Sequence, residues 1–305
     1  MRSPINQPTR RRLLVAFAMV ASMMFAGVGS AGVAAAQGSC AGTIPDARIA
    51  VQLFAMRSAI FGDGVEPTMD ALGDMGYQAV ETAFGTFGLE LGEFEVALKS
   101  NGIRPVASHG SLNLDNWDDT LRDAKRLNQR YVGSGGFGGP GIGSLADTLQ
   151  TAANLNILGE RAAARGMKVQ AHNHAGEFTT QYMYDVDGDG TEEMTSAWEI
   201  IANNVDPEYV SLQLDIHWIR TGVGLDNFDE VIRILETYQD VIDTLHVKDT
   251  NPDGSMAYLG EGTTDWVAVF QADPTIRYYI AEHDNPADAL EYAEGAFDYL
   301  DCIQF

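Results

Sequence analysis

The histidines are the residues of this chain most able to bind a metal ion or move a proton, and all of them follow one pattern. Each lies in or just after a short apolar run that is typical of a β-strand. The runs are PVASHG, KVQAHNH, SLQLDIH, DTLHVKD and YYIAEHD, which carry His109, His172, His174, His217, His246 and His283. Carboxylates lie near several of them. Strand ends are where a barrel or an open sheet builds its active site, so the pattern predicts an enzyme with a site at one rim.

Alternation along a strand sorts these residues by face, because residues two apart point to the same side. One set then forms at the ends of four successive strands, namely His172, Asp215, His246 and Glu282. Two imidazoles and two carboxylates suit Mn²⁺, Zn²⁺, Fe²⁺ or Co²⁺, with positions left open for a substrate. A lone histidine at such a place is more often a hydrogen-bonded core residue, but repetition at four strand ends favours a metal site. His283 has the opposite parity to Glu282 and is not expected in the set.

The elements that would position these residues alternate regularly along the chain. Expected strands span 47–56, 77–82, 104–109, 130–133, 168–174, 210–218, 242–248 and 277–282. Expected helices span 68–75, 93–100, 117–127, 145–165, 195–203, 228–237, 266–271 and 287–300. Eight β/α units predict the α/β class and a single-domain (β/α)8 TIM barrel over residues 47–305. A doubly wound dinucleotide-binding sheet is disfavoured, because no glycine fingerprint follows the first strand.

The first 36 residues have the composition of a targeting segment. Arg10, Arg11 and Arg12 precede an apolar stretch at 15–28 and a small-residue run that ends at Ala36. This predicts a twin-arginine-like signal peptide over 1–36, followed by a short N-terminal segment at 37–46. The apolar stretch is short and rich in alanine and glycine, so no stable membrane anchor is expected. We therefore expect export to the periplasm or the extracellular space by the twin-arginine route.

Charge and cysteine content narrow the function classes further. The net charge is −24. The predicted signal peptide contains basic residues but no acidic ones, so its loss would make the net charge more negative. A field of this sign repels phosphate backbones, so nucleic acid is not an expected partner. Cys40 and Cys302 are the only cysteines, and in an exported protein such a pair indicates a disulfide rather than a catalytic thiol. A closed barrel would permit this bridge, because its first and last units are neighbours. The sequence does not indicate an oligomeric state.

Two loops have distinctive compositions. Asp185, Asp187 and Asp189 lie in an acidic, glycine-containing loop similar to a calcium-binding loop. The twelfth position of that motif would be Ser196 instead of an acid, so a structural Ca²⁺ site and a solvated acidic turn both remain open. The glycine-rich segment 133–143 lacks the lysine of a phosphate-binding loop and is expected at the rim of the site.

Several motifs, taken in order, resemble one known family. They are VE at 80–81, SHG at 108–110, HNHAGEF at 172–178, LDIHW at 214–218, HVKD at 246–249, GEGTTDW at 260–266 and EHD at 282–284. Together they are similar to xylose isomerase-like TIM-barrel proteins of the sugar phosphate isomerase/epimerase superfamily, in its exported branch. The resemblance covers about 49–300 and implies metal ligands at Asp215, His246 and Glu282. His172 stands where the family has a glutamate.

The resemblance implies a metal-dependent isomerase or epimerase that acts on a non-phosphorylated sugar or keto-sugar through an enediolate. In this chemistry a metal polarises a carbonyl, and a carboxylate removes the proton from the adjacent carbon. Glu282 is the expected carboxylate, and Glu177 or Glu81 would replace the acid that the family has at His172. Lys248 would either stabilise the enediolate charge or pair with a rim carboxylate. The expected substrate-binding residues are His109, His174, His217 and Trp218.

Three other functions fit parts of the pattern. A lyase or dehydratase on 3-keto-glycosides or inosose-like polyols would use the same enediolate. A non-catalytic carbohydrate-binding barrel would explain the missing glutamate. A DNA-repair endonuclease can share the fold, but the net charge and the signal peptide oppose it.

Overall fold

The computed structural model describes residues 40, 42–186 and 188–305. Within these residues, eight parallel strands close into a barrel, each paired with the next around the ring. In that order they are β1 (Ile49–Gln52), β2 (Ala79–Ala83), β3 (Arg104–His109), β4 (Tyr131–Ser134), β5 (Lys168–His172), β8 (Val210–Asp215), β9 (Thr244–Val247) and β12 (Tyr278–Ala281). The (β/α)8 prediction is confirmed. The predicted signal peptide lies outside the described residues.

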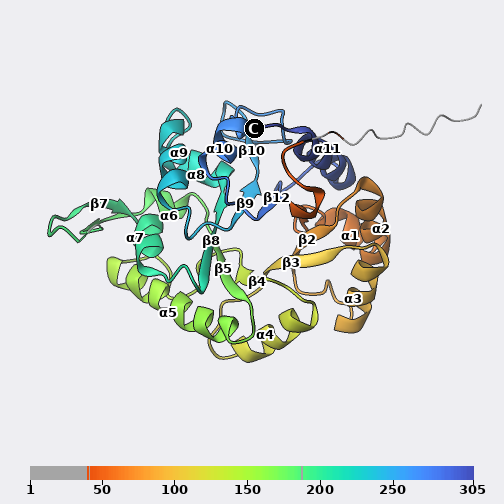
Figure 1. Ribbon diagram of the computed structural model, residues 1–305, viewed down its shortest axis with the longest axis horizontal. Coiled ribbons are helices and arrows are strands. Elements are labelled where there is room, and N and C mark those ends of the chain that lie inside the picture. The colour runs from red at the N-terminus through yellow and green to blue at the C-terminus, as the bar shows by residue number, and fades with distance from the viewer. Residues whose placement is uncertain (1–39, 41, 187) are drawn as a thin grey trace, which may run out of the picture. The chain divides into compact units, whose positions relative to one another are not determined.

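Helices surround the strands and cover the outside of the barrel (Figure 1). The helices that follow barrel strands are α2 (Val65–Met75), α3 (Leu91–Ser100), α4 (Trp117–Arg126), α5 (Leu145–Ala163), α7 (Ala197–Asn204), α9 (Phe228–Thr237), α10 (Trp266–Ala272) and α11 (Ala289–Cys302). Three further helices are α1 (Arg57–Asp63), α6 (Gly176–Thr179) and α8 (Ile216–Val223). None of the helices in this part of the chain is both long and apolar enough to cross a membrane.

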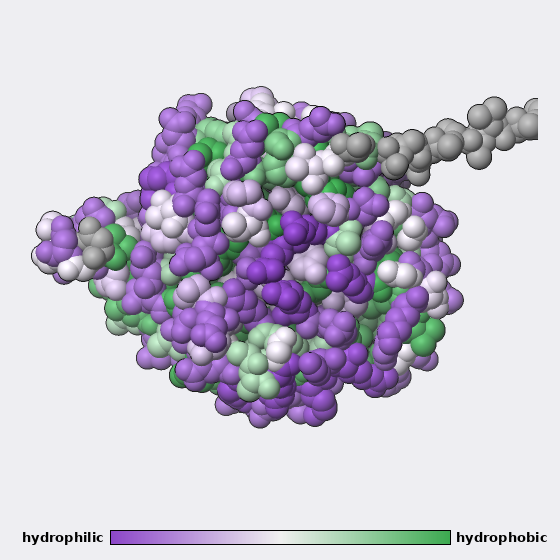
Figure 2. Space-filling view, in the orientation of Figure 1, coloured by the Kyte–Doolittle hydropathy of each residue, from purple (hydrophilic) through white to green (hydrophobic). Residues whose placement is uncertain are grey.

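The strands are buried on both faces, and the two faces differ in character. Outward residues such as Val51, Leu212 and Leu245 pack in the large core shared with the helices. Inward residues at the amino ends form a smaller apolar cluster that includes Ala50, Tyr131 and Ile280. Polar residues fill the interior above this cluster, toward the carboxyl ends. The interior is therefore a packed floor beneath a polar rim, and hydrophilic side chains gather over the middle of the face in Figure 2.

The two ends of the barrel unit meet because the first and last strands are neighbours. Ile49 of β1 pairs with Tyr279 of β12 in parallel register. Cys40 and Cys302 form a disulfide, and the backbone N–H of Thr43 donates to the carbonyl of Ile303 at 2.9 Å. The N-terminal segment is thus bound to the end of α11.

Several strands are shorter than the sequence pattern suggests, including the first, which spans Ile49–Gln52 instead of 47–56, and two of these differences affect the site. The run at 168–174 ends as a strand at His172, and the run at 210–218 ends at Asp215. Helix α8 begins immediately afterwards, because the Asp215 carboxylate accepts the backbone N–H of Trp218 at 2.9 Å and caps the helix. The expectation that His217 shares a strand face with Asp215 is therefore wrong.

A short hairpin, β6 (Gln181–Tyr184) with β7 (Glu193–Ser196), projects from the ring of helices (Figure 1). Its loop is the predicted calcium loop. Asp185 accepts the backbone N–H of Gly190 at 2.9 Å, and Asp189 accepts that of Thr191 at 2.7 Å. Among the described residues, no group of three potential metal ligands includes either aspartate. Asp187 lies outside the described residues.

Candidate metal centre

Four polar side chains converge at the carboxyl ends of four neighbouring strands: His172 of β5, Asp215 of β8, His246 of β9 and Glu282 directly after β12. One ligand atom from each lies within 4.8 Å of those of the others. All four residues are buried, and Glu282 is the most accessible at 4% exposure. Register contributes directly, because Asp215 pairs with His246 across β8 and β9. The structure thus brings together the set that alternation selects.

Three of these side chains each direct one polar atom toward the same space, and none of the three atoms is placed with the geometry of a hydrogen bond. Asp215 Oδ2, His246 Nδ1 and Glu282 Oε2 are buried and make no hydrogen bond within the described part of the chain. Yet Nδ1 lies only 2.7 Å from Oε2 and 3.8 Å from Oδ2. The two carboxylate oxygens also contact the Lys248 ammonium, but Nδ1 has no hydrogen-bond partner. Buried polar atoms normally have such partners, and a cation shared by the three atoms would provide one. The donor set therefore fits a divalent metal ion.

Hydrogen bonds behind the two imidazoles select which nitrogen faces this space. His172 Nδ1 lies 3.2 Å from Gln213 Oε1, and His246 Nε2 lies 2.6 Å from Glu81 Oε2. Both oxygens can only accept, so these nitrogens carry the protons. The other nitrogen of each ring is then available as a ligand, which is how metal-binding histidines are usually held.

Charge states of the four residues follow from burial and from one another. Burial and the nearby His246 lower the pKa of His172 well below its ordinary value, so this ring is neutral. Burial also opposes the charge of His246, but Glu282 and Glu81 outweigh it and raise its pKa, so without a metal ion Nδ1 also holds a proton, which metal binding would displace. Burial alone would raise the pKa of Glu282, but His246 and Lys248 lower it well below the ordinary value. Both acids of the set are therefore carboxylates, since the pKa of Asp215 is likewise lowered against the effect of burial, chiefly by Lys248.

Glu81 lies beneath the four residues and does not line the cavity above them. Its carboxylate is fully buried and accepts hydrogen bonds from Gln52 Nε2 and Gln170 Nε2 at 2.6 Å each, and from Gln213 Nε2 at 3.0 Å. Burial would raise its pKa, but His109 and His246 lower it below the ordinary value. A carboxylate enclosed by so many donors has no access to a substrate. Its contact with His246 Nε2 holds that ring from below, and the carboxylate lies apart from the cavity.

Replacing Glu81 with glutamine is expected to lower the affinity for Mn²⁺ by about 10- to 100-fold, the usual effect of losing a partner behind a ligand. The amide cannot accept from every donor that now surrounds the carboxylate, so His246 loses its fixed orientation. Isothermal titration of metal-free protein measures the change. Asp273→Asn is the matched control, because Asp273 is also fully buried but serves a turn at Thr275. Equal losses in the two variants would contradict the orienting role.

Lys248 is buried among three carboxylates. Its Nζ lies 2.9 Å from Asp215 Oδ2, 2.7 Å from Glu282 Oε2 and 2.7 Å from Asp284 Oδ1. Burial disfavours the ammonium, but Asp215 and Glu282 outweigh this and raise its pKa. Of the two roles expected from the sequence, the ion pair with rim carboxylates is present. Lys248 therefore shares two oxygens with the candidate metal ion.

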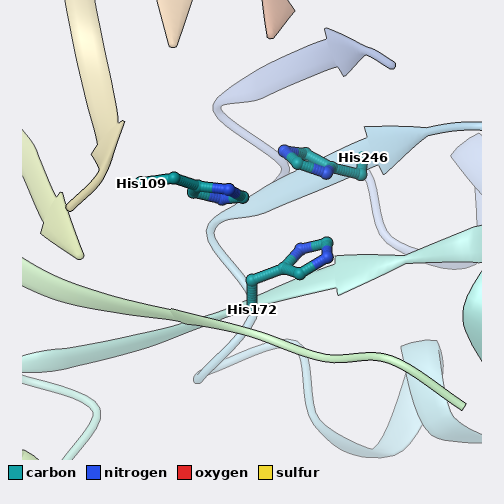
Figure 3. A group of neighbouring side chains, drawn as sticks. All are labelled: His109, His172 and His246. Carbon is teal, nitrogen blue, oxygen red and sulfur yellow. The ribbon is translucent and has the colours of Figure 1, made fainter. Parts of the chain in front are cut away.

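A cavity of about 290 Å³ opens above the centre. Its polar lining comprises His109, His172, His174, Lys248, Glu282 and Asp284. The rings of His109, His172 and His246 face one another from three strands (Figure 3), and His109 lies 5.0 Å from His172 and 5.1 Å from His246 between centroids. His109 Nε2 is 2.8 Å from Gln213 Oε1. His109 and His174 are thus placed where a substrate in the cavity would meet them.

Other predicted site residues lie outside this cavity. Glu177 belongs to α6 and accepts the backbone N–H of His174 at 2.8 Å. His217, in the first turn of α8, lies with Nδ1 2.9 Å from Thr250 Oγ1. Trp218 contacts two residues that line the cavity but does not line it itself. Its ring centroid lies 5.4 Å from that of His174 and 5.4 Å from Lys248 Nζ. His283 packs against Tyr258, in line with its parity.

Asp249 explains why two of the sequence motifs occur together. Its carboxylate accepts the backbone N–H groups of Gly260, Gly262 and Thr264 at 3.0–3.2 Å, which fixes the loop after β9. A Cβ atom at Gly262 would lie 2.3 Å from Asp249 Oδ1, so this close approach requires glycine. The HVKD motif therefore supplies His246 to the centre and Asp249 to the GEGTTD loop beside it.

Comparison with known proteins places the barrel in a family. The model of the xylose isomerase-like TIM barrel family matches residues 69–296. A sugar phosphate isomerase/epimerase from Parabacteroides distasonis has a similar structure, with a TM-score of 0.67, 20% identity, and coverage of 85% of this chain and 95% of that one. A D-allulose 3-epimerase from Methylomonas sp. is also similar, with a TM-score of 0.57, 15% identity, and coverage of 83% of this chain and 96% of that one.

A probable 3-DHS dehydratase from Bacillus anthracis is similar as well, with a TM-score of 0.62, 13% identity, and coverage of 83% of this chain and 98% of that one. No curated protein matches the sequence. Identities this low establish the fold alone, whereas the family match spans most of the barrel. The chain therefore belongs to the xylose isomerase-like TIM barrel family, as its motifs indicate.

Proposed function

We propose that the protein is a metal-dependent isomerase or epimerase that acts on a non-phosphorylated sugar or keto-sugar through an enediolate. The observation that carries this proposal is the double position of Glu282, which belongs to the buried ligand set and also lines the cavity. A carboxylate in this position can meet both a metal ion and a substrate carbon. Similar structures that are sugar epimerases support the proposal.

The chemistry is divided among few groups. A divalent ion such as Mn²⁺, Zn²⁺, Fe²⁺ or Co²⁺ at the four ligands supplies a Lewis acid that polarises a substrate carbonyl. Glu282 is held as a carboxylate and removes the proton from the adjacent carbon. The Lys248 ammonium, 2.7 Å from Glu282 Oε2, offsets the negative charge of the enediolate.

The position at which the proton returns decides the product. Return from Glu282 to the neighbouring carbon, as the hydroxyl proton passes from one oxygen of the enediolate to the other, gives isomerisation. Delivery to the original carbon from the opposite face gives epimerisation. Glu81 and Glu177 lie outside the cavity, so we infer that a group lining it, such as His174 or Asp284, delivers this proton.

A neutral substrate fits the charges of the cavity. Among the described residues, Lys248 is the one lysine or arginine that lines it, and its ammonium already contacts three carboxylates. A phosphate group is normally held by free Arg or Lys side chains. Export would also separate the protein from most sugar phosphates. We place it in the periplasm or outside the cell, which the Cys40–Cys302 disulfide supports.

A lyase or dehydratase is the second candidate, because the cavity lining includes Phe54, Ala83 and Phe84, whose apolar side chains offer a place for a group that leaves the sugar. The same enediolate would then expel a substituent from the next carbon, as on a 3-keto-glycoside or an inosose-like polyol.

Deuterium exchange tests both candidates. Metal-loaded protein is incubated with free sugars and 3-keto-glycosides in D₂O, beside chelator-treated protein and Glu282→Gln, and C–H signals are followed by NMR. Exchange without loss of a group, present only with metal and Glu282, supports the isomerase or epimerase. Release of a substituent supports the lyase. Complete absence of exchange would reject the enzyme and leave a carbohydrate-binding barrel.

A further inference from the structure

Four phenylalanines gather at the mouth of the cavity, and we name them the phenylalanine platform: Phe54, Phe61, Phe84 and Phe87. Phe84 lies at its centre, with ring centroids 5.5 Å from Phe54, 6.2 Å from Phe61 and 5.9 Å from Phe87. Rings at these distances are in contact. Phe54 and Phe84 line the same cavity as Glu282, so the platform continues the wall of the candidate site.

The platform is both exposed and anchored. Phe61 is 67% exposed and Phe84 is 54% exposed, although both side chains are large and apolar. Contiguous exposed apolar surface of this kind commonly marks a binding site. Phe87 lies 6.5 Å from the fully buried Phe94, which connects the platform to the core.

The backbone holds two of these rings in place against its local preference. Phe84 has φ 53° and Phe87 has φ 55°, so both occupy the left-handed region. A bulky residue adopts this conformation reluctantly, whereas asparagine or glycine does so readily. Such outliers persist where the surrounding structure determines them and gather at functional sites. We therefore infer that the turn after β2 serves to hold these two phenylalanine rings at the surface.

Arg57 ties the platform to the segment that carries Glu282. Its guanidinium lies 4.1 Å above the ring of Phe54 and donates to the Phe54 carbonyl at 2.8 Å. It also donates to Asn285 Oδ1 at 3.2 Å, three residues beyond Glu282. The platform and the reacting carboxylate are thus fixed relative to each other.

We propose that the platform binds an aryl group attached to the sugar that occupies the cavity, so that the substrates are aryl glycosides or their keto forms. This rests on the proposed function, because it assumes a sugar at the metal centre. At about 290 Å³ the cavity lies at the low end of ligand sites. It has room for one small sugar, and a substituent must extend toward its mouth.

An aryl group fits the platform better than a second sugar does. The hydroxyls of a second sugar would need hydrogen-bond partners, and phenylalanine side chains contain no hydrogen-bond donor or acceptor. Flat aromatic rings instead pack against other rings in offset or edge-to-face arrangements.

Matched pairs of phenyl and methyl glycosides test this binding. The pairs, in the gluco, galacto, manno and xylo series, are titrated calorimetrically into the metal-loaded protein. They carry no carbonyl, so binding is separated from turnover. In the series that fits the cavity, the phenyl member is expected to bind about tenfold tighter than the methyl member. Phe84→Asn, which suits the left-handed backbone, and Phe61→Ser are each expected to reduce this ratio to near unity.

Val96→Ser is the matched control, because Val96 is 63% exposed but lies outside the platform. It should keep the ratio of the unchanged protein. Equal affinities within every pair, failure of every glycoside to bind, or a ratio that survives both platform variants would overturn the proposal. So would a loss of self-association in Phe61→Ser, seen by sedimentation without a change in the ratio, since a second copy of the chain would then cover the platform. Deuterium exchange on free sugars by the unchanged protein judges the proposed function separately.

Discussion

Asp215→Asn is expected to lower the affinity for Mn²⁺ by more than about a hundredfold, beyond the effect of losing a partner behind a ligand. The substitution preserves shape but removes the buried charge that faces His246 and Lys248. An amide oxygen binds a cation far more weakly than a carboxylate does, and its NH₂ group could face the ion. Calorimetric titration of chelator-treated protein, checked by metal analysis, measures the loss.

Asp243→Asn is the control for this variant. Asp243 is also a largely buried acid and pairs with Lys168 at 2.7 Å, outside the candidate centre. It should bind Mn²⁺ with the affinity of the unchanged protein. If Asp215→Asn, shown to be folded by circular dichroism, bound Mn²⁺ equally well, Asp215 would not be a ligand.

Lys248→Met is expected to destabilise the metal-free protein by about 3–5 kcal/mol, because breaking a buried ion pair leaves charge without compensation. The variant leaves Asp215, Glu282 and Asp284 without the ammonium that now contacts all three. Saturating Mn²⁺ should restore most of the lost free energy of unfolding, because the ion neutralises Asp215 and Glu282 in its place. Urea unfolding with and without Mn²⁺ measures both values.

Lys168→Met supplies the comparison, since it removes a partly buried lysine from Asp243 and leaves the centre unchanged. Mn²⁺ should raise the free energy of unfolding of Lys168→Met by the same amount as that of the unchanged protein. It should raise that of Lys248→Met by much more. An equal gain in the two variants would show that Lys248 and the ion do not share the same carboxylates.

The core of the candidate site could be predicted from sequence because the chemistry and the strand period coincide. His172 and Asp215 are the last residues of their strands, and both have the inward parity of Gln170 and Gln213. The same reasoning failed for His217, because alternation stops where α8 begins. The signal was present in Asp215 itself, since aspartate is a favoured helix N-cap.

The role of Glu81 could not be predicted from its motif. Its partners Gln52, Gln170 and Gln213 come from three other strands and look unremarkable in sequence. Only closure of the barrel brings these amides around one carboxylate. Asp284 shows a different limit: it is two residues after Glu282 and so has the same parity, but its contact with Lys248 depends on the loop after β12.

His172 is the candidate ligand that stands where the resemblance implies a glutamate, so the most direct test is to count nitrogen ligands. Electron spin echo spectroscopy of the Mn²⁺-loaded protein should detect two coordinated imidazole nitrogens, one each from His172 and His246. His172→Gln and His246→Gln should each retain one. A spectrum without nitrogen coupling, or one that His172→Gln leaves unchanged, would contradict a centre built from two histidines and two carboxylates.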